Sequence, residues 1–297
     1  MELRTLHYFL AVAREQNISA AAQSLHLSQP ALSTQLKALE EELGKQLLIR
    51  GTKGSRKVVL TEEGMILRKR AEEILSLVQK AEEEITRPDE TIVGDVVIGA
   101  GETDTVRLLA KTAQKLKQQY PGIHYHISSG NAEYVLEYLD KGLIDFGLLF
   151  REPDRKKYEV LPLPAADTWG VLMRRDAPLA QKEFITPEDL WELPLIISHQ
   201  KGDDQRLAQW MQREITALNV VATYNLVFNA SLLVDEGFGY ALCFDKLIHT
   251  EGTNLCFRPF SPKLEVPAYI VWKKYQIFSK AADHFLQSVL ELISEQP

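Results

Sequence analysis

The chain has 297 residues, of which 45% are apolar and 25% are charged, and this composition excludes a disordered chain and fits a globular protein of two or three domains. No apolar run could span a bilayer, no signal-peptide pattern opens the chain, and the two cysteines lack a metal-binding spacing. We therefore expect a cytoplasmic protein without a disulfide framework, a zinc site or a cofactor, in which Cys243 and Cys256 are packing residues.

Residues 1–60 are predicted to form three short helices and a hairpin, and they carry eight Lys and Arg against five Asp and Glu. Ser19 is expected to cap the second helix and Ser28 the third. The buried stripe of the third helix is predicted to consist of Leu32, Leu36, Leu39 and Leu43. After Gly44, apolar and basic residues alternate around two glycines, which indicates two short strands and a loop. This order predicts a winged helix-turn-helix.

A second face of the third helix carries Pro30, Ser33, Thr34 and Lys37, and a basic loop with Arg50, Lys53, Arg56 and Lys57 follows it. Taken alone, such a face fits an ordinary solvated surface equally well. Beside a basic hairpin, it favours a helix that enters the major groove of DNA, with the loop close to the phosphates.

Residues 61–90 are predicted to form one long helix. Its apolar residues recur at alternating intervals of four and three, at Gly64, Leu67, Ala71, Ile74, Val78, Ala81 and Ile85. This heptad pattern favours pairing with the same helix of a second subunit, and packing on its own chain is the alternative.

Strands alternate with helices from residue 91 onward, which predicts parallel sheets in two α/β lobes. We expect the first lobe to comprise residues 91–161 and 267–297, and the second residues 162–266, with strand NLVF and helix LAQWMQREITAL in the second. Because the chain crosses twice between the lobes, a ligand-binding cleft is expected between them.

The segment AAQSLHLSQPALSTQLKALEEELGKQLLIR, followed by TEEG, closely resembles the LysR-type transcriptional regulators over residues 1 to 87, and GDVVIGAG, KGLIDFGLL and VDEGFGYALC follow that family's layout more loosely. The resemblance implies a homodimer or homotetramer that binds an interrupted inverted repeat in double-stranded DNA near a promoter, with a small-molecule effector in the cleft and RNA polymerase as a further partner. It departs from the family at Leu48, where Phe is usual, at Thr34, where many relatives carry Arg, and in a longer hairpin loop.

By position, the resemblance implies DNA contacts by Gln29, Pro30, Ser33, Thr34, Lys37, Lys53 and Arg56. It implies effector contacts by Gly101, Glu102, Thr103, Ser129, Asn131, Ser198, His199 and Asn229. Capping of the next helix by Thr103 or Asp104 is the preferred explanation of these residues. If Glu102 and Asp104 instead face the cleft, they would compete with an acidic ligand, which favours a neutral or cationic effector.

His124 and His126 lie two apart on one strand, but no third ligand is near in sequence, so a metal site is not predicted. No nucleophile or dinucleotide-binding motif is present, which argues against an enzyme. The alternative function is a two-lobed small-molecule-binding protein or enzyme with an accessory DNA-binding domain.

Overall fold

The computed structural model describes residues 1–51, 57–86, 92–199 and 204–295. The chain divides into two compact units, Met1–Asp89 and Glu90–Pro297. The first unit consists of α1 (Leu3–Glu15), α2 (Ile18–Ser24), α3 (Gln29–Leu43), β1 (Leu48–Arg50), β2 (Val58–Leu60) and α4 (Glu62–Thr86). β1 and β2 pair as an antiparallel hairpin, which we call the wing. Three helices and a wing confirm the predicted winged helix-turn-helix.

The helices of the first unit enclose a small core in which Phe9, Leu32 and Leu36 are almost completely buried. Two local predictions were wrong. Leu43 is 41% exposed, because α3 ends at Gly44 and its last turn extends beyond the core. Helix α2 is capped by Asn17, whose side chain accepts hydrogen bonds from the backbone amides of Ser19 and Ala20, rather than by Ser19.

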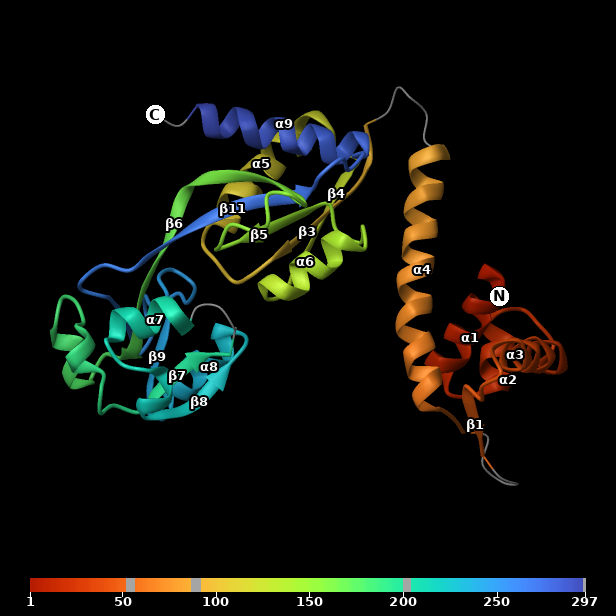
Figure 1. Ribbon diagram of the computed structural model, residues 1–297, viewed down its shortest axis with the longest axis horizontal. Coiled ribbons are helices and arrows are strands. Elements are labelled where there is room, and N and C mark those ends of the chain that lie inside the picture. The colour runs from red at the N-terminus through yellow and green to blue at the C-terminus, as the bar shows by residue number, and fades with distance from the viewer. Residues whose placement is uncertain (52–56, 87–91, 200–203, 296–297) are drawn as a thin grey trace. The chain divides into compact units, whose positions relative to one another are not determined.

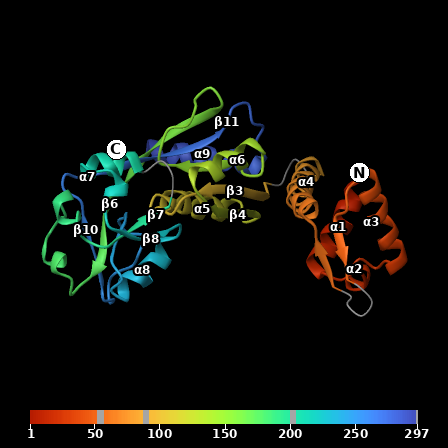
Figure 2. The ribbon, with the colours of Figure 1, turned by 60° about the horizontal axis from the view of Figure 1, so that its bottom comes forward.

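The apolar stripe of α4 faces two environments. In the first half, Gly64 and Ala71 are buried, and Leu67 packs against the core of the first unit. A Cβ atom on Gly64 would lie 2.2 Å from the Leu47 carbonyl oxygen. In the second half, Ile85 is 82% exposed. Packing on the chain itself therefore describes the first half, and the second half remains available to a partner. Figure 1 shows α4 beside α1, and Figure 2 views it nearly end-on.

The second unit is built on a nine-stranded sheet in the order β4-β3-β5-β11-β6-β9-β7-β8, with β10 paired to β6. Its strands are β3 (Gly94–Ala100), β4 (Ile123–Ser129), β5 (Phe146–Leu149), β6 (Tyr158–Arg174), β7 (Leu195–Ser198), β8 (Val220–Tyr224), β9 (Tyr240–Phe244), β10 (Leu255–Pro259) and β11 (Glu265–Lys273). Its helices are α5 (Val106–Gln119), α6 (Ala132–Asp140), α7 (Asp204–Met211), α8 (Val227–Asp235) and α9 (Lys280–Ser294), with short 3-10 turns at Pro178–Gln181, Pro187–Asp189 and Ile215–Ala217.

The sheet is mixed rather than parallel throughout. β3 is parallel to β4 and β5, and β7 is parallel to β8 and β9, but β6 and β11 run antiparallel to their neighbours. β6 and β11 are long because they cross from one lobe to the other (Figure 1). The prediction of a parallel sheet was therefore wrong for these two crossing strands.

Two further elements differ from expectation. The segment NLVF, predicted as a strand, forms the turn before α8 and the first residues of that helix. The strand in this region is β8, which ends before NLVF, at Tyr224. Helix α7 ends at Met211, because Gln212 adopts a positive φ of 56° and breaks the predicted longer helix.

Helices cover both faces of each lobe's sheet. In the first lobe α5 and α9 pack on one face and α6 on the other (Figure 1). In the second lobe α7 and α8 contribute to separate hydrophobic clusters. No helix within the described residues is both long and apolar enough to cross a membrane. The lobes leave the carboxyl ends of β3 and β7 near the segments where β6 and β11 cross.

Candidate nucleic-acid interface and interlobe cleft

The N-terminus of α3 is fixed by Ser28, whose hydroxyl accepts a hydrogen bond from the Ala31 amide, and by Pro30 in the first turn. The five predicted groove residues of α3 share one face: Gln29, Pro30, Thr34 and Lys37 are exposed and Ser33 is half-buried. The opposite face holds the buried leucines. A helix so oriented presents short and hydrogen-bonding side chains to a groove.

The hydroxyl group of Thr34 on this face already takes part in a hydrogen bond within α3. Its hydroxyl donates a hydrogen bond to the Pro30 carbonyl, one turn earlier, at 2.9 Å. The hydroxyl proton is therefore used within the helix, which leaves the methyl group and the oxygen lone pairs for a partner. Contact with a thymine methyl or acceptance of one hydrogen bond from a base fits this state.

Glu40 joins α3 to the wing. Its carboxylate accepts hydrogen bonds from the backbone amides of Leu47 at 2.8 Å and Leu48 at 3.0 Å, and its second oxygen lies 3.4 Å from the Arg50 guanidinium. The Glu40 side chain is only 16% exposed. The start of β1 is thus held by an acceptor on α3, and Arg50 is paired within the protein. The sequence analysis did not single out Glu40, because its partners come from a different element.

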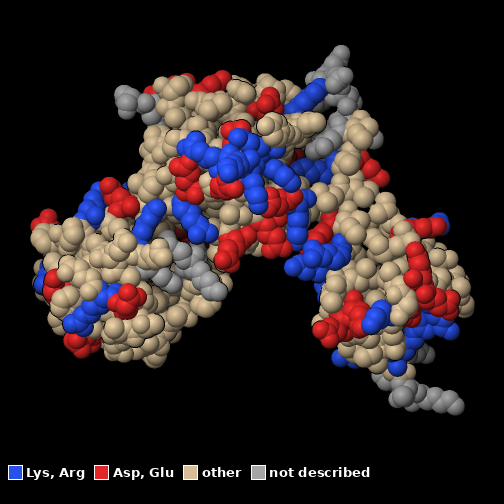
Figure 3. All heavy atoms as spheres, viewed as in Figure 1, with Lys and Arg blue, Asp and Glu red and all other residues tan. Residues whose placement is uncertain are grey.

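Lys53 and Arg56, the predicted wing contacts, lie outside the described residues. Within the described part of the wing, Lys57 is exposed. Acidic and basic residues are intermixed on the face of the molecule seen in Figure 3. By sequence, residues 61–297 carry 26 Lys and Arg against 36 Asp and Glu, so the basic excess is local to residues 1–60.

A small cleft lies between the two lobes of the second unit and has a volume of 30 Å³. Its polar lining includes Glu102, Ser198 and Asn225. Its aromatic lining consists of Phe150, Trp169, Tyr224 and Phe244. A cavity of this volume has room for about one water-sized group. Two of the eight predicted effector residues, Glu102 and Ser198, therefore line the cleft directly, whereas the sequence analysis did not find the aromatic residues.

Glu102 bridges the two lobes. It follows β3 in the first lobe, and its Oε2 accepts a hydrogen bond of 2.6 Å from the backbone amide of Val227, the first residue of α8 in the second lobe. A carboxylate is stabilised at this position by the unpaired amides and the dipole of the helix start. The acidic residue after β3 thus binds at the start of a distant helix.

Thr103 and Asp104, the residues after Glu102, interact with the crossing strand β6 and with the start of α5. The Thr103 hydroxyl donates to Asp167 on the crossing strand β6 at 2.5 Å, and both side chains are buried. Burial raises the pKa of Asp167, and the Thr103 hydrogen bond opposes that rise. Asp104 pairs with Arg107 at 2.9 Å and lines a separate 310 Å³ hollow beside α5. The predicted capping by Thr103 is borne out at one amide, because its hydroxyl also accepts a hydrogen bond of 2.9 Å from the backbone of Thr105 at the start of α5, whereas the side chain of Thr105 itself makes no capping hydrogen bond.

The remaining predicted effector residues do not line the cleft. Gly101 packs against Phe150, because a Cβ there would lie 2.8 Å from that ring. Asn131 caps α6 by accepting a hydrogen bond from the Tyr134 amide. The other three, Ser129, His199 and Asn229, are exposed.

The two cysteines are buried. Cys243 lines the cleft, and burial, followed by the charges of Asp245 and Glu102, raises its pKa to about 12. A thiol with such a pKa is protonated and unreactive near neutral pH. His124 and His126 both approach Asp95, at 3.9 and 3.3 Å, on an exposed edge of the first lobe. Within the described residues, no group of histidine, cysteine or acidic side chains could hold a metal ion.

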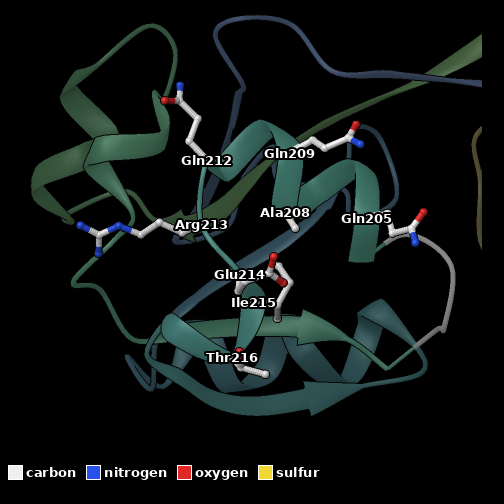
Figure 4. Close-up of a pocket in the computed structure, with 8 residues that line it drawn as sticks. All are labelled: Gln205, Ala208, Gln209, Gln212, Arg213, Glu214, Ile215 and Thr216. Carbon is white, nitrogen blue, oxygen red and sulfur yellow. The ribbon is translucent and has the colours of Figure 1, made fainter.

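A larger hollow of 820 Å³ lies on the surface of the second lobe, along α7 and the segment after it (Figure 4). Gln205, Gln209 and Gln212 line it together with Arg213. The guanidinium of Arg213 stacks over the Trp191 ring at 4.0 Å and lies 3.4 Å from the Glu192 carboxylate, so it already has partners within the protein. This hollow belongs to one lobe alone, and it contains none of the predicted effector residues.

Comparison with known proteins gives matches over most of the chain. The family described as "Bacterial regulatory helix-turn-helix protein, lysR family" matches residues 3–65, and the "LysR substrate binding domain" matches residues 90–294. The HTH-type transcriptional regulator BsdA of Bacillus subtilis (strain 168) is 38% identical over 298 residues, covering 96% of this chain and 99% of that protein. The hydrogen peroxide-inducible genes activator of Pectobacterium carotovorum subsp. carotovorum is 31% identical, over 64% of this chain and 62% of that protein.

Solved structures share the fold. The LysR family transcriptional regulator CbnR has a TM-score of 0.77 at 20% identity, with 99% of each chain covered. Full-length CbnR in complex with its target DNA also has a TM-score of 0.77, at 21% identity, and covers 98% of this chain and 100% of that chain.

Proposed function

Since this chain belongs to the LysR family of DNA-binding transcriptional regulators, which carry an effector-binding domain, we propose that it binds an interrupted inverted repeat near promoters and that a small-molecule effector in the interlobe cleft modulates this binding. The observation that carries the proposal is the exposed face of α3 beside the wing. Such a helix, held by two others and flanked by a hairpin, fits the major groove.

Within the groove, we assign base contacts to Gln29, Pro30, Ser33 and Thr34. Pro30 and the Thr34 methyl suit apolar contacts with base edges, and Gln29 and Ser33 suit hydrogen bonds. Lys37 lies one turn further along α3 and suits a phosphate. Lys53 and Arg56 are assigned to the DNA backbone or the minor groove, because they add positive charge to the sequence between the two strands of the wing.

We propose a homodimer or homotetramer, in which the second half of α4 pairs with the same helix of another subunit. Ile85 is exposed, and Ile74 and Val78 are only partly buried within one chain. Apolar side chains repeated at heptad spacing are stabilised when two helices cover them. A two-fold symmetric protein matches the two halves of an inverted repeat.

For the effector, we assign the cleft, with Glu102 and Ser198 as direct contacts. Gly101, Thr103, Ser129, Asn131, His199 and Asn229 are retained as contacts for an arrangement in which the lobes have separated. The Glu102 hydrogen bond to α8 connects the lobes, so a ligand that binds there is coupled to their separation.

We propose a regulator without enzymatic activity that works in the cytoplasm, where chromosomal DNA and RNA polymerase are found. The alternative, a two-lobed binding protein or enzyme with an accessory DNA-binding domain, is disfavoured because BsdA, which is 38% identical over 96% of this chain, is a transcriptional regulator. Peroxide sensing, suggested by the name of one relative, is disfavoured by the buried, protonated thiol of Cys243.

Selection from a random pool of double-stranded DNA tests the proposal. The purified chain should enrich two half-sites in inverted orientation, separated by a fixed spacer. A variant with Ser33→Glu, which places a negative charge on the groove face, should enrich none. Equal enrichment of all sequences would contradict specific binding, and enrichment by the variant of the same site would contradict the assigned role of α3.

A further inference from the structure

We propose that the effector of this chain is a small organic cation, whose ammonium group binds the carboxylate of Glu102 between the aromatic walls of the cleft. The inference rests on the proposed function, because it takes the interlobe cleft as the effector site. It adds the chemical class of the ligand, which follows from the charge, the occupied helix start, the aromatic lining and the size of the cleft.

The charge of the cleft is negative. Among the described residues that line the cleft, Glu102 is the only one with a charged side chain, and none is Lys, Arg or His. This negative charge also acts on Cys243, which lines the same cleft. Burial has the largest effect on the pKa of its thiol, and the charges of Asp245 and Glu102 raise that pKa further. Such a potential attracts cations and repels carboxylates and phosphates.

The site that would serve an anion is already filled. The amide at the start of α8, on Val227, donates to Glu102 Oε2 at 2.6 Å. A ligand carboxylate would have to displace a carboxylate that is tethered to the same molecule and therefore present at a high effective concentration. A cation has no such competitor. Among the described residues no donor to Oε1 of Glu102 is found, so an ammonium group can bind that oxygen while Oε2 keeps its contact with Val227.

The aromatic walls favour the same class of ligand. Trp169 and Phe244 pack edge to face with ring centroids 4.7 Å apart, and Phe150 packs on Phe244 in the same manner at 5.4 Å. With Tyr224, they form the apolar part of the lining. Aromatic rings attract ammonium ions through their negative faces, whereas they cannot solvate a carboxylate.

The size of the cleft limits which part of the ligand it holds. A volume of 30 Å³ admits a group about as large as one water, and an ammonium group is of that size. An organic substituent must then extend between the lobes and separate them. The Glu102 side chain also accepts the hydrogen bond that links the first lobe to α8. Ligand binding at Glu102 is therefore coupled to the arrangement of the lobes.

Thermal unfolding of the full-length chain tests the proposed class. The cations are methylammonium, n-propylammonium and butane-1,4-diammonium chlorides, compared with sodium chloride at equal ionic strength. The anions are sodium acetate and sodium butyrate. A ligand that binds only the folded chain raises the Tm by mass action. We expect at least one ammonium ion to raise the Tm and neither carboxylate to do so.

Two matched variants locate the effect. Glu102→Gln keeps the size of the side chain and an oxygen that can accept from Val227, but removes the charge, so it should weaken binding of the ammonium ion at least about tenfold. Asp104→Asn removes the same charge two residues away, where the carboxylate pairs with Arg107 outside the cleft, and should leave the affinity unchanged.

Several outcomes would overturn the inference: a Tm raised by carboxylates instead of ammonium ions, equal affinity of the wild-type and Glu102→Gln chains for the ammonium ion, or no response to any ammonium ion. DNA selection on the same preparations separates this inference from the proposed function. A selected inverted repeat without an ammonium response overturns the ligand class alone, whereas the absence of any selected site overturns the proposed function.

Discussion

Replacement of Glu40 by alanine should loosen the wing, because it removes the acceptor that holds the start of β1. Leu47 and Leu48 are 2% and 1% exposed, so their amides would have no ready access to water. Each buried amide left without an acceptor costs about 1–3 kcal/mol, so the two amides together give a loss of about 2–6 kcal/mol in the free energy of unfolding of the first unit. The lost Arg50 pair adds at most about 1 kcal/mol, since both partners touch solvent.

Hydrogen exchange measures this effect at the two amides themselves. Tryptophan fluorescence would not, since the four tryptophans, at positions 169, 191, 210 and 272, all lie outside the first unit. In Glu40→Ala, the Leu47 and Leu48 amides should exchange much faster than in the wild-type chain. Glu40→Gln keeps a side-chain oxygen as acceptor and should retain most of the protection. Operator affinity should follow the same order, because the wing is held through β1.

The neighbouring Glu41→Ala serves as the control, because Glu41 is exposed and no side-chain hydrogen bond of its carboxylate is found among the described residues. Wild-type exchange rates in Glu40→Ala would refute the reasoning. Equal loss of protection in Glu40→Ala and Glu40→Gln would show that the charge, and not the acceptor geometry, holds the wing.

Lys37→Ala and Arg56→Ala should each weaken operator binding and reduce the slope of log affinity against log salt concentration by about one unit. Lys45→Ala is the control, because the Lys45 ammonium lies near Glu63, and it should change neither quantity. Unchanged slopes for Lys37→Ala and Arg56→Ala would contradict the assigned DNA contacts. Ile74→Lys should separate the subunits in sedimentation, because it places a charge among the apolar side chains of α4 that are proposed to pair. Ser76→Lys is the control, because Ser76 is exposed, and it should leave the subunits assembled. An intact Ile74→Lys oligomer would show that other surfaces hold the subunits together. Cys243 should resist iodoacetamide at pH 8 until the chain unfolds, and modification of the folded chain would contradict the burial. Its pKa is raised from 9.0 to about 12, so the unfolded state loses the proton first and stability should fall as pH rises through that window.

Local signals made the bounds of α3 predictable. Ser28 and Pro30 specify where α3 begins, and Gly44, with a φ of 63°, specifies where it ends. The cap of α2 was missed because Asn17 and Ser19 are both good capping residues, and only the folded backbone shows which one accepts the hydrogen bonds.

Contacts between residues far apart in the chain could not be predicted from the sequence. The heptad pattern of α4 shows an apolar stripe, but not that its first half packs on its own chain at Gly64 and Leu67. Glu102 was noticed as an unusual acid, yet its partner, Val227, is 125 residues away and lies in a stretch that reads equally as strand or helix. The aromatic lining of the cleft was missed for the same reason, since three of its members come from three separate strands and Phe150 directly follows a fourth.

A genome-wide pull-down of the DNA bound by this chain in cells tests the central claim most directly. The account predicts a small number of sites upstream of promoters that share an interrupted inverted repeat, and the loss of these sites in the Ser33→Glu variant. Broad coverage without a common sequence, or the same sites in the variant, would contradict the claim that the exposed face of α3 makes this protein a sequence-specific regulator.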